Sequence, residues 1–337
     1  MKERIEYIDL AKGICILLVV LDHISVGGYF SGGDYPLNDI FEQTRMPLYF
    51  ILSGLFFKDY DGGLKTFLLR KTNRILVPYL FFMTLYIVSA KAIQHFTGYD
   101  TTGVNITGIW APLWFLICLF WMNVIFAAVY YTVKRFIQPE SLVSEAVLGV
   151  CVLCIGIAGY YIGYIPLNFD TAMTCLPFLW MGYILNRKLH FLQLGIGWPW
   201  ALLIGIIMLA ILHFTYKGDN LFYLNIYDTP LALIYLSGLL GTLGVLLISR
   251  VIKRLPVISY IGRYSIIVLC THMVVVKAVI AFLNMLPFYR NETFWQSNTV
   301  QSFTILILAL ICSVMCCWFL HKYLPWFTAQ RDLIKLK

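Results

Sequence analysis

The chain has 337 residues, of which 60% are hydrophobic and 12% are charged. Soluble domains are about half apolar and about a quarter charged, so this composition excludes a soluble globular fold and predicts an integral membrane protein. The formal net charge of +8 is spread over short clusters between apolar runs, a pattern typical of cytoplasmic loops that also excludes a nucleic-acid partner.

A helix that crosses a bilayer core of roughly 30 Å needs about 20 mainly apolar residues. The apolar runs of this chain predict an all-α bundle of about ten transmembrane helices. The expected ranges are 8–27, 40–57, 75–95, 110–131, 143–161, 170–186, 199–215, 229–249, 263–283 and 300–321. We expect a single membrane-embedded domain over residues 1–337, with no appended soluble domain.

The distribution of Lys and Arg predicts how the bundle is oriented. With the N-terminus inside, nineteen of the 25 basic residues fall in inner segments and two in outer segments. An odd number of helices would place the later loops on the wrong sides, so we expect both termini to be cytoplasmic. The first apolar stretch is long, carries Lys12, Asp22 and His23, and lacks a small-residue cleavage site, which favours a retained helix over a signal peptide.

All nine cysteines fall within apolar runs. Cys151 and Cys154 form a C-x-x-C motif, but no second ligand pair accompanies it. We therefore expect neither a metal site nor a disulfide, and interpret the cysteines as small residues in helix packing.

Polar residues within the membrane are candidate functional residues, because burying a charge there costs several kcal/mol. Lys12 and His23 are eleven positions apart, which is about 16 Å along a helix axis and nearly the same face. This places a cation near the cytosol and a titratable base deeper in the membrane. The alternatives are a snorkelling lysine and a histidine satisfied by a neighbouring helix.

Two further predicted helices carry such residues. Arg45 is expected near the outer mouth with Asp22, Asp39 or Glu42 as its anionic partner, either in the site or in a structural ion pair. His272 is expected near mid-membrane, with Ser265 seven residues earlier on the same face, and either can act in the site or bond a neighbouring helix.

A basic cluster precedes the third predicted helix. Arg70 and Arg74 are spaced at i and i+4, and guanidinium groups bind phosphate in a bidentate manner, so Arg70, Lys71 and Arg74 are candidate phosphate ligands. The alternative is an ordinary positive-inside cluster.

The sequence motifs that contain these residues resemble those of acyltransferase family 3, the membrane O-acyltransferases that modify extracytoplasmic sugars. The matching segments are Tyr7–Gly13 with Asp22 and His23, Met46–Phe57, Lys71–Arg74 with Pro78, Ala111–Leu116, and Tyr264–Ser265 with His272. They span roughly residues 4–325 in the family's order. Lys12 stands where arginine is common, and Arg45 stands where histidine often precedes Met-Pro.

The resemblance implies a reaction in which cytoplasmic acyl-CoA, most often acetyl-CoA, donates an acyl group to a hydroxyl of an extracytoplasmic or lipid-linked sugar. It implies that Arg70, Lys71, Arg74 and Lys12 hold the phosphates of the donor and that His23 is the general base. Arg45 would orient the acceptor or polarise the thioester, with His272 and Ser265 as secondary candidates. The donor is a substrate, and no permanently bound cofactor is expected.

Two other functions suit the same features. A transporter of a lipid-linked sugar or small metabolite also has about ten helices and intramembrane charges, although we detect no inverted repeat. A membrane sensor that keeps the family fold without activity is disfavoured by the presence of His23. The implied location is the cell (inner or plasma) membrane, where lipid surrounds the bundle.

Overall fold

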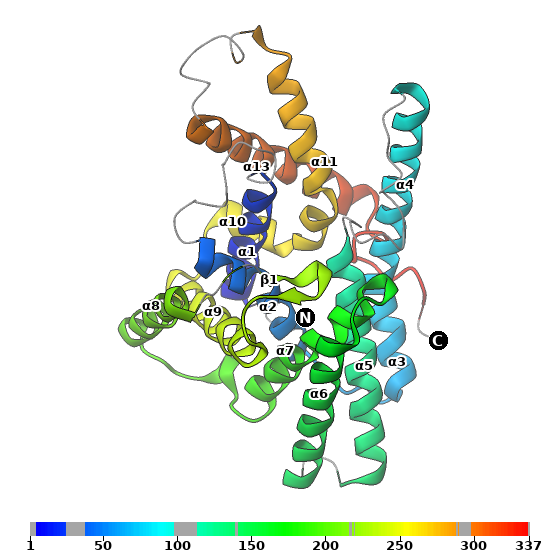
Figure 1. Ribbon diagram of the computed structural model, residues 1–337, viewed down its shortest axis with the longest axis vertical. Coiled ribbons are helices and arrows are strands. Elements are labelled where there is room, and N and C mark those ends of the chain that lie inside the picture. The colour runs from blue at the N-terminus through cyan, green and yellow to red at the C-terminus, as the bar shows by residue number, and fades with distance from the viewer. Residues whose placement is uncertain are drawn as a thin grey trace. The chain divides into compact units, whose positions relative to one another are not determined.

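The computed structural model describes residues 5–24, 38–97, 113–138, 141–215, 218, 220–287, 289 and 298–335. These residues are almost entirely helical, apart from one short antiparallel hairpin (Figure 1). The longer helices are α1 (Glu6–Ile24), α2 (Asn38–Leu55), α4 (Val77–Thr97), α5 (Trp114–Phe136), α6 (Leu142–Ile162), α7 (Phe169–Arg187), α8 (Trp198–Thr215), α9 (Leu231–Ile252), α11 (Ser265–Asn284) and α13 (Asn298–Tyr323). The shorter elements are α3 (Gly63–Lys71), α10 (Pro256–Arg263), the π-helical turn η3 (Thr72–Leu76), the 3₁₀ turns η4 (Pro166–Asn168), η5 (Phe191–Gln193) and η6 (Phe222–Leu224), and strands β1 (Asn220–Leu221) and β2 (Ile226–Tyr227).

Local sequence explains where several helices begin and end. The Ser141 hydroxyl accepts a hydrogen bond from the Ser144 amide and caps α6, which is followed by Gly163 with a positive φ of 78° that glycine adopts readily. Pro256 stands in the first turn of α10, where its missing N–H removes no helical hydrogen bond.

Each of the ten predicted ranges coincides with one of the longer helices. Residues 25–27 and 110–112, at the ends of two predicted ranges, lie outside the described residues. Seven helical segments are long and apolar enough to cross a membrane: Gly63–Phe96, Trp114–Phe136, Leu142–Ile162, Trp198–Thr215, Leu231–Ile252, Ser265–Asn284 and Val300–Tyr323. The protein is thus an all-α multi-pass membrane protein, while the number of crossings stays a prediction because α1, α2 and α7 carry more polar residues.

Three features differ from the expected pattern. The third predicted helix starts earlier, because α3, η3 and α4 follow one another without a break from Gly63, so the basic cluster lies within a helical segment. The ninth range is broken at Tyr264, where α10 ends and α11 begins. A β-hairpin pairs Asn220 with Tyr227 and Leu221 with Ile226, and strands this short leave no periodic signal in a sequence.

The chain forms two compact units, each drawn from separate parts of the sequence. Unit 1 consists of residues 1–48, 196–216 and 240–324, and unit 2 consists of residues 49–195, 217–239 and 325–337. The expectation of a single domain stays a prediction.

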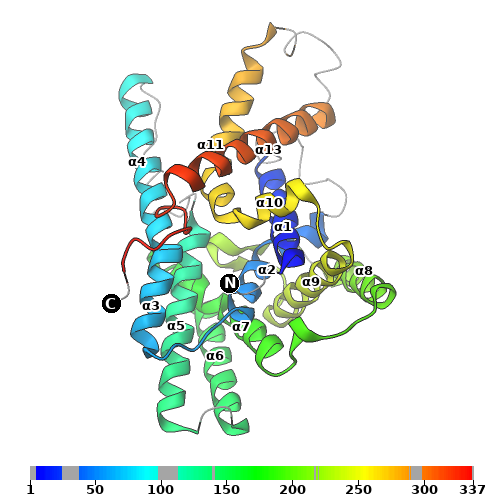
Figure 2. The same cartoon turned by 180° about the vertical axis from the view of Figure 1, so that it is seen from behind.

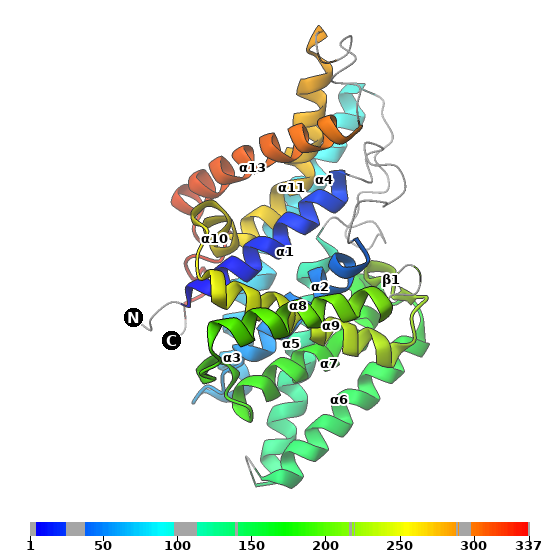
Figure 3. The ribbon, with the colours of Figure 1, turned by 90° about the vertical axis from the view of Figure 1, so that its left-hand side faces the viewer.

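In unit 1, α1 packs against α10, α11 and α13. Figure 2 shows α13 crossing α11, and Figure 3 shows α1 running beside α10. The core between these helices contains buried branched side chains from α1 and α11, such as Ile16, Val20, Ile267 and Val268. Small residues bring α1 and α10 into backbone contact, since a Cβ on Gly13 would overlap the Ile258 carbonyl.

In unit 2, α7 packs against α5 and α6. The face of α6 that meets α7 carries Gly156, where a Cβ would overlap the Pro177 ring, and Gly159, where it would overlap the backbone of α7. The close approach of two helices through small residues is typical of membrane bundles, because dispersion forces between them act over short distances.

Candidate functional site

His23 lies in the last turn of α1, with a half-buried side chain. Its Nδ1 is 2.8 Å from the Val19 carbonyl oxygen, one turn earlier in the same helix. A carbonyl oxygen only accepts hydrogen bonds, so in the neutral ring Nδ1 carries the proton and Nε2 carries the lone pair. The backbone of α1 therefore fixes the tautomer in which Nε2 is the basic atom.

His272 lies in α11 and is 2% exposed. Its Nδ1 is 2.8 Å from the Leu269 carbonyl and 3.2 Å from the Val268 carbonyl, which fixes the same tautomer as in His23. Its Nε2 is buried and has no hydrogen-bond partner within the described part of the chain. A buried lone pair without a donor is rare in folded proteins and marks a position where a ligand or a water can bind.

The two imidazoles are in direct contact within unit 1. Their ring centroids are 4.7 Å apart and the ring planes meet at 77°, an edge-to-face arrangement. The contact between α1 and α11 thus brings together two residues that are separated by most of the chain. The partly exposed imidazole of His23 thus has a second, buried imidazole beside it.

Arg45 of α2 forms an ion pair with Asp22, the residue before His23, with 2.6 Å between a guanidinium nitrogen and a carboxylate oxygen. Arg45 is 8% exposed. Asp22, one of the three carboxylates considered for Arg45, is thus a partner of its guanidinium. Because His23 donates to Val19, its ring is oriented by a backbone carbonyl, and Asp22 is directed to Arg45 instead.

Lys12 and Ser265 lie farther from the histidine pair. Lys12 is on the same continuous helix as His23, about 16 Å away along the axis. Ser265 is the first residue of α11, so about 10 Å of helix separates it from His272. Neither residue adds a further group at the two imidazole rings.

The basic cluster lies in unit 2, at the junction of α3 and η3. The Arg70 guanidinium stacks over the Tyr60 ring at 4.7 Å from its centroid, and the Lys71 ammonium lies 5.3 Å from the Phe67 centroid. Arg74 pairs with Asp332 and donates to the Ala329 carbonyl, both near the C-terminus. The three cations therefore have separate partners, and the expectation that Arg70 and Arg74 act together on one phosphate stays a prediction.

One residue of this region was not singled out in the sequence. Asn73, fully buried between Lys71 and Arg74, hydrogen-bonds the backbone of Leu333 and Ile334. No sequence signal could have identified it, because its partners are about 260 positions away in the chain. The Ala111-Pro112 dipeptide of the expected motif lies outside the described residues.

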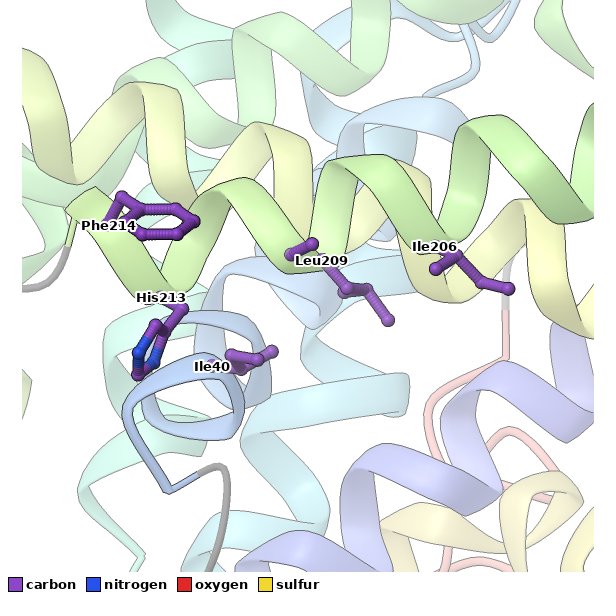
Figure 4. Close-up of a pocket in the computed structure, with 6 residues that line it drawn as sticks. Ile40, Ile206, Leu209, His213 and Phe214 are labelled. Atoms are coloured by element: carbon purple, nitrogen blue, oxygen red, sulfur yellow. The ribbon is translucent and has the colours of Figure 1, made fainter.

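A shallow apolar groove of about 480 Å³ lies elsewhere in unit 1, between α2 and α8. It is lined by Ile40, Ile206, Leu209, Ala210, His213 and Phe214. Figure 4 shows the His213 ring beside Ile40. The lining does not include His23 or His272, so the groove is separate from the histidine pair.

The fold and the paired imidazoles define a helical, multi-pass membrane protein with a titratable site among its helices. The family model described as an acyltransferase domain matches residues 5–322, nearly the whole chain, and the protein therefore belongs to acyltransferase family 3. No curated protein and no solved structure matched the chain.

Proposed function

We propose that this protein transfers an acyl group, most often acetyl, from cytoplasmic acyl-CoA to a hydroxyl of an extracytoplasmic or lipid-linked sugar. The family supplies the general activity of a membrane acyltransferase. One observation supports His23 as its general base: the hydrogen bond from Nδ1 to the Val19 carbonyl leaves the lone pair on Nε2. A neutral imidazole takes up a proton near physiological pH, as general-base catalysis requires.

In this proposal Nε2 of His23 accepts the proton of the acceptor hydroxyl as its oxygen attacks the thioester carbonyl. The new C–O bond forms, the C–S bond breaks, and the sulfur leaves as a thiolate. The imidazolium returns the proton to that thiolate, which yields free coenzyme A and regenerates the base. Atoms and charges balance without a metal or a permanently bound cofactor.

The proposal gives the other polar residues supporting roles. Arg70, Lys71 and Arg74, with Lys12, hold the donor phosphates through charge-assisted hydrogen bonds. Arg45 is paired with Asp22, the residue before His23, and orients the acceptor or polarises the thioester carbonyl. His272 borders the ring of the base, and Ser265 is a secondary candidate. The proposed location is the cell membrane.

The test is acyl transfer by the purified protein in liposomes, measured as release of free coenzyme A in the presence of an acceptor sugar. His23→Gln is expected to reduce kcat by about 100-fold or more, because general-base catalysis contributes about 10²–10⁴ in rate. His321→Gln is the matched control, since His321 also bonds the carbonyl four residues earlier, that of Cys317, on a membrane helix.

Near-normal kcat in His23→Gln would remove His23 from the mechanism. Movement of an acceptor across the liposome membrane without any release of coenzyme A would instead support a transporter. In either case the His321→Gln variant shows whether the loss of an equivalent histidine affects the fold.

A further inference from the structure

The C-terminal segment docks on η3 within unit 2 through the side chain of Asn73. The Asn73 carboxamide nitrogen donates to the Ile334 carbonyl over 2.8 Å, and its oxygen accepts from the amides of Leu333 and Ile334 over 3.0 and 2.8 Å. Asn73 is 0% exposed, so the side-chain end of each of these hydrogen bonds is buried. One buried amide thus satisfies three backbone groups of the tail and anchors it.

The rest of the docked segment is also ordered by specific contacts. The Phe327 ring stacks on Phe81 of α4, with centroids 4.3 Å apart, and Thr328 is fully buried. Ala329 adopts a left-handed conformation with φ of 61°, which is unfavourable for an L-residue with a side chain. Its carbonyl accepts a hydrogen bond from Arg74, which helps to hold this turn.

Arg74 connects the tail to the basic cluster through a second, weaker contact. Its guanidinium lies 3.3 Å from the Asp332 carboxylate, and the two side chains are 49% and 35% exposed. An ion pair this exposed exchanges readily with ions in solution. The tail therefore has a buried anchor at Asn73 and an exposed contact at Arg74.

Both contacts fall in a π-helical turn, Thr72–Leu76. Such turns are uncommon within helices and frequently occur at functional sites. Here the turn directs consecutive residues to the same segment: Asn73 holds the tail backbone, and Arg74 holds the tail carboxylate. Arg74 is also one of the proposed ligands of the donor phosphates.

We propose that the C-terminal tail forms part of the donor site and that Asp332 is an internal anion, which a phosphate of acyl-CoA displaces from Arg74. The inference rests on the proposed function, because it takes Arg74 as a phosphate ligand. A phosphate and a carboxylate accept from the same guanidinium N–H groups, and a doubly charged phosphate binds them more strongly. Asn73 keeps the tail docked while Asp332 is exchanged, so the displaced segment is limited to residues near Asp332.

The experiment is titration calorimetry of coenzyme A against the full-length protein in detergent, for wild type, Asp332→Asn, Arg74→Ala and the double variant. Asp332→Asn removes the competing charge and is expected to tighten binding by about two- to fivefold, the range for an exposed ion pair. Arg74→Ala is expected to weaken binding. In the Arg74→Ala background, Asp332→Asn is expected to change the affinity by less than about 1.5-fold. The four proteins form a double-mutant cycle, which isolates the interaction between Arg74 and Asp332.

Asp61→Asn is the control, since it removes one negative charge from an exposed position just before α3 in the same unit. Unchanged affinity in Asp332→Asn, with wild-type binding intact and Arg74→Ala weakened, would overturn the role of Asp332 and leave the proposed function in place. The role of Asp332 would also be overturned if Asp61→Asn tightened binding as much as Asp332→Asn does, and if Asp332→Asn gave the same gain in affinity in the Arg74→Ala background. That result would show a general effect of removing negative charge. Absence of coenzyme A binding by the wild type would refute both proposals.

Discussion

At the residue scale, three histidines on long helices share one local arrangement. The Nδ1 atoms of His23, His272 and His321 each lie within 3.2 Å of the carbonyl four residues earlier in their own helix. Because the donor of this hydrogen bond is the ring N–H, the helix itself selects the tautomer. The three differ in their surroundings. Within the described residues, the rings of His23 and His272 contact each other, while His321 contacts neither of them.

His272 is expected to act as a positioning residue for His23. His272→Phe keeps an aromatic ring in the same core but removes both nitrogens, so the ring beside His23 becomes apolar. We expect kcat to fall by about tenfold or more, with little change in KM for acyl-CoA. This is a modest share of the rate enhancement of about 10²–10⁴-fold that general acid–base catalysis contributes. The measurement is steady-state kinetics over a range of pH.

A purely structural role for His272 would give a different result. Its replacement would then lower thermal stability while leaving kcat and the pH profile of the folded enzyme unchanged. His272→Gln, which retains hydrogen-bonding groups without the ring, completes the comparison by separating loss of the nitrogen from loss of ring packing.

At the scale of elements, the contact between α1 and α10 holds the helix that carries His23. A Cβ on Gly262 of α10 would overlap the Asp9 carbonyl of α1 and also approach the Gly13 amide. The obstacles are backbone atoms, which cannot move aside as a flexible side chain does. The two helices therefore depend on the absence of a side chain at this crossing.

Gly262→Ala is expected to force α1 and α10 apart and to destabilise the protein by about 1–3 kcal/mol, as overpacking does in other cores. Because α1 ends at His23, acyl transfer is expected to fall as well. Gly195→Ala is the matched control, since a Cβ there meets nothing within 4 Å. Thermal unfolding in detergent measures the effect, and equal melting temperatures for the two variants would contradict this account of the crossing.

At the scale of the whole molecule, the membrane topology depends on three long helices that are less apolar than the others. Seven helical segments are strongly apolar, while α1, α2 and α7 carry polar or charged residues such as Asp22, Arg45 and Asp170. Polar groups within a membrane helix are tolerated when they are buried in the bundle, and Arg45 and Asp170 are buried. These helices can therefore cross the membrane despite their lower hydropathy.

If all ten helices cross, both termini lie on the same side. Single cysteines placed at Lys2 and Lys335 of an otherwise cysteine-free variant are expected to be protected from an impermeant thiol reagent in intact cells and labelled after lysis. A cysteine at Lys253, in the segment between α9 and α10, is expected to behave in the same way. Labelling of one terminus alone in intact cells would show an odd number of crossings and refute this topology.

Much of the fold could be predicted because it depends on short-range properties. The ten expected ranges coincide with helices, since hydropathy and helical periodicity are properties of consecutive residues. The elements that were missed, α3, α10 and the β1–β2 hairpin, are short, and short segments carry too little periodic signal. The break at Tyr264 follows Gly262 by two residues, but a single glycine near a strongly apolar run is a weak signal.

The candidate site could be predicted as a set of residue types but not as an arrangement. Lys12, His23, Arg45 and His272 were identified because polar side chains are costly in lipid. The sequence left three carboxylates open for Arg45, and the ion pair with Asp22 appears only in the folded structure.

The sequence by itself therefore determined that the protein is helical, that it lies in a membrane and that it belongs to an acyltransferase family, because composition, periodicity and motifs are read along the chain. The tertiary structure alone decided that His23 meets His272 and that Asn73 and Arg74 hold the C-terminal tail. The physical reason is that hydropathy specifies which surfaces are buried. Which distant side chains meet depends on packing and hydrogen bonding between helices, which no local pattern encodes.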